Sequence, residues 1–230
     1  MPDRPKRYGD RRRQRDKPLA IRFTADDHDL LGWIGRVGAV QTVHVMARSG
    51  RDRRPVGLTL QRLAENGFLT SARLLSDTGP LFVATRSGLT IAGLEYLNPA
   101  EISIESAHHQ IAVAWLALEL EREHSADHLI FERELRADPG HWAALRHRPD
   151  CVIETSADRG IAIEVELSIK SPARLDDIMR AYAGSPAVDA VRYYAGNERV
   201  RRALSNAVAR TGSEALVEIR RWERGLRAGR

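Results

Sequence analysis

The chain has 230 residues, of which 43% are hydrophobic, and it carries a net charge of +5. This length suffices for one large domain or for two small domains with cores of their own. The single cysteine, Cys151, excludes an intrachain disulfide and any zinc site built from several cysteines. No apolar run reaches the roughly 18 residues that span a bilayer, and no signal peptide is apparent, so we expect a cytoplasmic protein without a membrane partner.

Residues 1–18 hold eight basic and three acidic side chains, a surplus equal to the whole net charge. Because almost no apolar residue interrupts them, we expect a disordered basic tail that attracts phosphates or acidic surfaces. A tail that only improves solubility is an equally weighted alternative. Nearly every cation of the chain is an arginine, which suits bidentate phosphate contacts, although a GC-rich genome would explain the same bias.

Residues 19–98 predict a domain of three helices followed by a hairpin. Thr24 and Asp27 form the pattern of a capping box at the start of the first helix, which Gly38 ends. A short helix is expected at residues 42–48 and a third from about residue 54 to 66. Two strand-like runs around the turn residues 76–79 then form the hairpin.

Three helices and a hairpin in this order make a winged helix-turn-helix, whose third helix enters the major groove of DNA. At about 100° per residue, this helix buries one side and leaves the other to solvent. Winged helices also serve as protein-interaction modules, and solvated helix faces often carry Arg and Gln. We nevertheless favour duplex contacts by the side chains at the start of this helix, along its exposed side and on the hairpin: Arg53, Arg54, Leu58, Gln61, Arg62 and Arg73.

Residues 99–230 predict a second domain with the element order α-β-β-β-α-β-α-β. Its first helix is nearly all apolar, so both of its sides must be covered, and residues 106–122 are the natural place for contacts between two copies. The pair His108 and His109 cannot point the same way on a helix, so one is expected at the joint between the domains. The strands are expected at 129–135, 150–155, 161–168 and 190–195 with a last one near the C-terminus, and the later helices at 171–183 and 198–211.

Pro149 and Asp150 at the start of the second strand, with Glu164 in the middle of the third, resemble the PD-(D/E)XK nuclease-like fold. Carboxylates that converge from neighbouring strands repel each other unless a cation such as Mg²⁺ or Mn²⁺ lies between them, and that cation can activate a water. An alternative interpretation is structural. Apolar and polar residues alternate along the third strand, as in any strand with one solvent-exposed face, and Glu164 and Glu166 would then lie on the exposed face.

Active members of that superfamily usually have a lysine two residues after the second acid, where this chain has Glu166. Lys170 has the right strand parity but would lie ~13 Å too far along a continuous strand. Arg180 on the following helix can stabilise a phosphate but transfers protons poorly. We therefore favour a site that does not cleave efficiently and requires no cofactor, and that either retains a divalent ion such as Mg²⁺ or Mn²⁺ or shapes a DNA-facing groove. An active nuclease would use Asp150, Glu164, Glu166 and Lys170, with the metal held by Asp150 and Glu164.

Several short motifs, in order over about residues 22–211, resemble the replication-relaxation family of plasmids and integrated mobile elements. They are the winged helix, the linking helix, FERELR at 131–136, RPD at 148–150, IEVELS at 163–168 and IMRAY at 178–182. The resemblance implies a DNA-binding protein of a mobile element that acts in replication, transfer or transcriptional control. We expect a homodimer on double-stranded DNA. The alternatives are a Mg²⁺- or Mn²⁺-dependent endonuclease and a protein-interaction module of a replication or relaxase complex.

Overall fold

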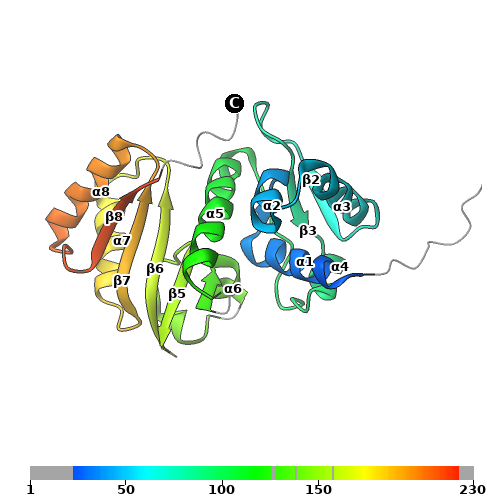
Figure 1. Ribbon diagram of the computed structural model, residues 1–230. Helices are drawn as coiled ribbons and strands as arrows, with labels where there is room; N and C mark the ends of the chain where they lie inside the picture. Colours follow the sequence, from blue (N-terminus) through cyan, green and yellow to red (C-terminus); the bar gives the residue numbers. More distant parts are fainter. Residues whose placement is uncertain (1–22, 126–127, 138, 157, 223–230) are drawn as a thin grey trace, which may run out of the picture.

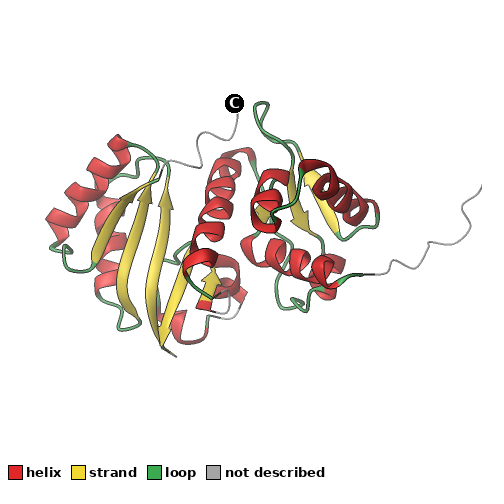
Figure 2. Cartoon of the chain, in the orientation of Figure 1, coloured by secondary structure: helices red, strands yellow, loops and turns green. Residues whose placement is uncertain are grey.

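The computed structural model describes residues 23–125, 128–137, 139–156 and 158–222, and the predicted basic tail lies outside these ranges. Within them the chain is a mixed α+β protein with eight α-helices and two β-sheets (Figure 1, Figure 2). The long helix α5 (Ile104–Glu123) stands between the half that contains the smaller sheet and the half that contains the larger one. None of the described helices is long and apolar enough to cross a membrane.

The first half has the element order helix, strand, two helices, two strands and a short helix. Its three strands form an antiparallel sheet in the order β1-β3-β2, and Thr70 pairs with Val83 in the register of the hairpin. The two-residue strand β1 and the short helix α4 were absent from the predicted order. The elements are α1 (Ala25–Val37), β1 (Ala39–Val40), α2 (Thr42–Ser49), α3 (Arg53–Glu65), β2 (Leu69–Ala72), β3 (Leu81–Ala84) and α4 (Arg86–Ile91).

The predicted ends of α1 are confirmed. The Thr24 backbone N–H donates to Asp27 Oδ2 at 3.0 Å, and the Asp27 backbone N–H donates to Thr24 Oγ1 at 3.2 Å, which completes the capping box. Gly38 follows the helix with a φ of 110°, a backbone angle that residues other than glycine rarely adopt. Local sequence signals therefore fix both ends of this helix.

The second half contains a five-stranded sheet in the order β4-β5-β6-β7-β8. The pairs β4-β5 and β5-β6 are antiparallel, whereas β6-β7 and β7-β8 are parallel and connected by helices. The later helices agree closely with the prediction, because Ser171 and Asn197 cap them at the expected places. The elements are β4 (Leu129–Phe131), α6 (Glu132–Ala137), a 3₁₀ helix (Gly140–Ala144), β5 (Cys151–Ser156), β6 (Arg159–Glu166), α7 (Pro172–Ala183), β7 (Val188–Ala195), α8 (Glu198–Thr211) and β8 (Val217–Arg221).

Both faces of the larger sheet are covered. Helices α7 and α8 lie on one face, and α5 lies on the other and separates this sheet from the first half (Figure 1). One hydrophobic cluster runs from α1 through α5 to β6, so the apolar core crosses the boundary at residue 98. The prediction that α5 is covered on two sides is confirmed. Most of its apolar residues are buried within the chain.

Two further expectations about the larger sheet are wrong. The segment 129–135 is not one strand, because β4 ends at Phe131 and α6 begins at Glu132. The Glu134 carboxylate accepts the Phe131 backbone N–H at 3.0 Å, a local bond that favours the helical turn. Strand β6 is also not half-solvated, since α7 covers the face that carries Glu164 and Glu166, and each is only 5% exposed.

Candidate functional site

The outer face of α3 carries most of the side chains predicted to contact DNA. Arg53 and Arg54 are exposed at the start of the helix, and Leu58 is 60% exposed one turn later. Gln61 is exposed and donates to Glu65 at 2.8 Å. An open hollow of about 480 Å³ runs along this face. The opposite side buries Val56, Leu60 and Leu63 as the helical period predicts.

Arg62 is placed differently from its neighbours, because its guanidinium pairs with the buried carboxylate of Asp27. Burial by itself raises the pKa of Asp27, but hydrogen bonds from the Thr24 backbone and from Arg62 outweigh it and lower the pKa below its usual value. This ion pair joins α3 to the first turn of α1. Arg62 therefore has a structural role that its position on the helix did not predict.

Arg73 follows β2 directly and is exposed on the connection to β3. The antiparallel pair β2-β3 follows α3, so the structure brings the hairpin and the helix into one half of the chain. Arg53, Arg54, Leu58, Gln61 and Arg73 thus share exposure to solvent, whereas Arg62 is half-buried.

The predicted acids of the second half lie close together on β5 and β6. Cys151 pairs with Ile163, which sets Asp150 beside Glu164 at the end of the antiparallel ladder. Asp150 Oδ2 accepts the Val165 backbone N–H at 2.7 Å, and its Oδ1 lies 2.8 Å from His109 Nε2. The backbone of β6 therefore fixes one oxygen of Asp150, and a histidine of α5 fixes the other.

His109 connects the acidic cluster to the rest of the core. Burial by itself lowers the pKa of His109, but the charge of Asp150 and the hydrogen bond to it outweigh this effect and raise the pKa. A small cavity of about 20 Å³ beside it is also lined by Val37 of α1 and Arg133 of α6. One histidine of the adjacent pair thus faces the joint between the two halves, as predicted, and His108 is exposed.

Glu164 has its own partners on the α7 side of the sheet. His147 Nε2 lies 2.8 Å from Glu164 Oε1 in the geometry of an ion pair rather than of a well-aligned hydrogen bond, and the Tyr182 hydroxyl donates to the same oxygen. Burial raises the pKa of Glu164, contact with His147 offsets part of this, and the charge of Asp150 raises it further. The Glu164 carboxyl group therefore ionises less readily than a carboxyl group in water.

Glu166 pairs with Lys170 through the lysine Nζ. The prediction that the chain bends only after Lys170 is wrong, because β6 ends at Glu166 and the bend comes before residue 170. Lys170 nevertheless contacts Glu166 and not Glu164 in the ion pairs of the described residues. The Lys170 ammonium group therefore balances the charge of the Glu166 carboxylate.

The donor set does not fit a divalent cation in this arrangement. Both oxygens of Asp150 already accept hydrogen bonds, and one oxygen of Glu164 contacts both His147 and Tyr182. Among the described residues, no group of three or more His, Cys, Asp or Glu side chains is placed to hold a metal ion. The three acids of the cluster are instead contacted by side chains of the chain itself, which are His109, His147, Tyr182 and Lys170.

Three side chains that contact the acids were not predicted as their partners: His109, His147 and Tyr182. They lie 41, 17 and 18 residues along the chain from the acids that they contact. Only the position of His147 two residues before Pro149 signals proximity to the cluster. Comparisons with models of protein families and with curated proteins find no match to this chain.

Proposed function

We propose that this protein binds double-stranded DNA through α3 and the β2-β3 hairpin. The observation that carries the proposal is the exposed face of α3, where two neighbouring arginines without an ion-pair partner among the described residues precede Leu58 and Gln61. The order α1-β1-α2-α3-β2-β3 with an antiparallel sheet supports a winged helix-turn-helix. In such a module the third helix lies in the major groove.

The chemistry of this face suits the groove. The Arg53 and Arg54 guanidinium groups can bind phosphates or the O6 and N7 atoms of guanine, and Gln61 can bind adenine. Leu58 offers an apolar contact to a thymine methyl group. Glu65 limits the attraction to phosphates, so we assign base contacts to the middle of the helix and phosphate contacts to its start and to Arg73. A role in replication, transfer or transcription of a mobile element follows from the motif resemblance and is part of the proposal.

We expect Arg53→Ala/Arg54→Ala to weaken binding to DNA from the protein's own locus by roughly tenfold or more. Each lost phosphate contact should also flatten the plot of log affinity against log salt by about one unit. Mobility-shift titrations at several salt concentrations measure both quantities. The matched control is Arg199→Ala/Arg202→Ala, which removes two exposed charges from α8 in the other half. Equal affinity of the two double variants would overturn the assignment of α3.

Arg62 needs a different comparison because it also holds Asp27. Arg62→Ala removes the ion pair and any DNA contact, whereas Asp27→Asn weakens the ion pair and leaves the α3 face intact. If both variants lose the same affinity and the same melting temperature, Arg62 acts through the fold. If only Arg62→Ala loses affinity, Arg62 contacts DNA directly.

For the larger sheet we propose a role in holding DNA or assembling copies of the chain, without efficient cleavage. The pairing of every acid of the cluster with a group of the chain itself supports this. The rival endonuclease is favoured by one observation, the convergence of Asp150 and Glu164 on adjacent strands. The same binding reactions, incubated with Mg²⁺ or Mn²⁺ and resolved on one gel, decide the matter. Cutting that disappears in Glu164→Ala would establish the endonuclease.

A further inference from the structure

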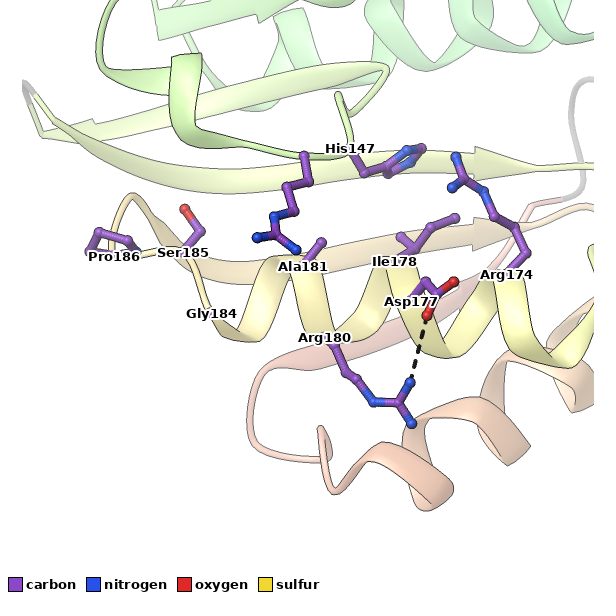
Figure 3. A pocket seen from close by; sticks show the side chains of 10 residues that line it. His147, Arg174, Asp177, Ile178, Arg180, Ala181, Gly184, Ser185 and Pro186 are labelled. Atoms are coloured by element: carbon purple, nitrogen blue, oxygen red, sulfur yellow. Dashed lines mark ion pairs between the residues drawn. The ribbon is translucent and has the colours of Figure 1, made fainter.

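A second feature of the larger half is a cavity of about 680 Å³ between α7 and the segment that precedes β5 (Figure 3). Arg146 and His147 line it from that segment, Arg174 and Arg180 from α7, and Ser185 from the turn that leads to β7. This volume lies within the range of sites that hold a nucleotide-sized ligand. It lies in the other half of the chain from the α3 face, so its ligand does not depend on the proposed DNA contacts of α3.

The charge of this arginine pocket is not balanced by the chain. Arg180 pairs with Asp177 at 3.7 Å, and Figure 3 shows it on the far side of α7 from His147. Arg146 and Arg174 are exposed and have no ion-pair partner among the described residues. Figure 3 shows the Arg174 guanidinium reaching to the side of α7 where the His147 ring lies. Two positive charges thus remain for a ligand.

Two polar groups at the pocket have unused hydrogen-bonding capacity. The Ser185 hydroxyl is buried and has no hydrogen-bond partner among the described residues, which is costly unless a ligand or water satisfies it. His147 also lines the pocket, and its buried Nε2 lies 2.8 Å from Glu164 Oε1 without forming a hydrogen bond among the described residues. Donors of three kinds therefore line the same space.

We propose that this arginine pocket binds a phosphate monoester, either on a free nucleotide or at the phosphorylated 5′ end of a DNA strand. Arginine forks match phosphate oxygens in a bidentate manner. A monoester carries about −1.5 to −2 charges at pH 7, which balances the two unpaired arginines, whereas a backbone diester carries only one. Serine and histidine donors complete the shell around the remaining oxygens.

Calorimetric titration of the full chain with deoxynucleoside 5′-monophosphates and with inorganic phosphate tests the proposal. We expect both to bind and the corresponding nucleosides not to bind. Arg146→Ala/Arg174→Ala should weaken binding at least about tenfold, because each lost charge-assisted hydrogen bond is among the stronger kinds. Arg199→Ala/Arg202→Ala, with the same loss of charge on α8, should bind as the unaltered chain does.

A second arm distinguishes the two sources of the phosphate. Oligonucleotides with a 5′-phosphate and with a 5′-hydroxyl are compared against the mononucleotides, and preference for the phosphorylated strand identifies a strand end. Arg146→Lys/Arg174→Lys keeps the two positive charges but removes the planar guanidinium groups that bind phosphate in a bidentate manner. The affinity of this variant for phosphate should therefore lie between that of the unaltered chain and that of the alanine variant. Equal binding of citrate and phosphate, equal binding by the alanine variant, or no binding at millimolar ligand would overturn the proposal. Arg53→Ala/Arg54→Ala should leave phosphate binding unchanged, which separates a failure here from a failure of DNA binding by α3.

Discussion

His44 shows how one buried residue makes stability depend on pH. It is fully buried at the start of α2, where its Nδ1 accepts the Gln41 backbone N–H at 2.9 Å and its ring meets Trp115 of α5 edge to face at 4.7 Å. Burial lowers the pKa of His44 to about 3. The folded chain therefore keeps this ring neutral at pH values where the unfolded chain protonates it.

We expect His44 to destabilise the fold as pH falls below its unfolded pKa of about 6.5, by up to about 1.4 kcal/mol per pH unit. His44→Asn keeps an acceptor for the Gln41 N–H but cannot titrate, so its free energy of unfolding should depend less on pH between 6.5 and 4.5. Urea titrations at several pH values measure the slope. An unchanged slope would contradict the assignment.

His109 should change the pH dependence of stability in the direction opposite to His44. Its raised folded pKa contributes stability that is present below the unfolded pKa and is lost as pH rises through the folded value. His109→Gln should therefore make the loss of stability on acidification steeper, while His44→Asn makes it shallower.

Residue by residue, the sequence predicted local partners and missed distant ones. The Thr24–Asp27 cap was recognisable because its members are three residues apart. The pairing of Asp27 with Arg62 was not, since the two lie 35 residues apart and meet only after α3 packs on α1. Burial of Glu164 was missed for the same reason, because α7 covers it only in the folded sheet.

At the scale of elements, two glycines in helices show how the space around a residue decides the effect of a substitution. In α4, a Cβ added to Gly88 would lie 2.1 Å from the backbone oxygen of Phe68, directly before β2. In α3, a Cβ on Gly57 would meet nothing within 4 Å. Both residues are helical, so they differ mainly in the space around them.

Gly88→Ala should therefore destabilise the protein by about 3 kcal/mol, the upper end of the usual cost of overpacking. Gly57→Ala should instead stabilise it by roughly 0.5–1 kcal/mol, because alanine loses less backbone entropy in a helix. Thermal or urea unfolding of the two variants provides the measurement. Destabilisation by both would mean that the α3 face is tighter than the structure indicates.

The ends of several helices were predicted better than the complete element order, which lacked β1, α4 and α6. Ser171 and Pro172 marked the start of α7, and glycines marked the ends of α1 and α2. Residues 129–135 were predicted as one strand, yet the strand ends at Phe131 and α6 begins at Glu132. There Arg133 donates to the Gly35 and Asn98 carbonyl groups, contacts across the joint that no local pattern reveals.

At the scale of the whole molecule, α5 packs against both halves, so we expect the two halves to unfold together. Ala107 and Ile111 pack with Ala39, Leu81 and Val83 of the smaller sheet, and α5 also contacts β6. Separating the halves at residue 98 would expose these apolar surfaces to water. Each Å² of exposed apolar surface would cost about 25 cal/mol of free energy.

We expect the full chain to unfold in a single cooperative transition and a fragment of residues 1–98 to lack one. A fragment of residues 1–124, which retains α5, should recover more structure but expose the side of α5 that faces β6. Circular dichroism during heating, with binding of a hydrophobic dye, compares the three chains. A sharp transition in the 1–98 fragment would show that the smaller sheet folds on its own.

The same shared helix sets an order of events during synthesis. Chains grow at roughly 5–20 residues per second, so α5 follows β3 out of the ribosome by a few seconds. Through that interval the side of β1 and β3 that carries Ala39, Leu81 and Val83 has no cover, because Ala107 and Ile111 are not yet available. We therefore expect the nascent smaller sheet to be a transient target for chaperones, and slower translation while α5 emerges would lengthen the time in which the sheet can aggregate.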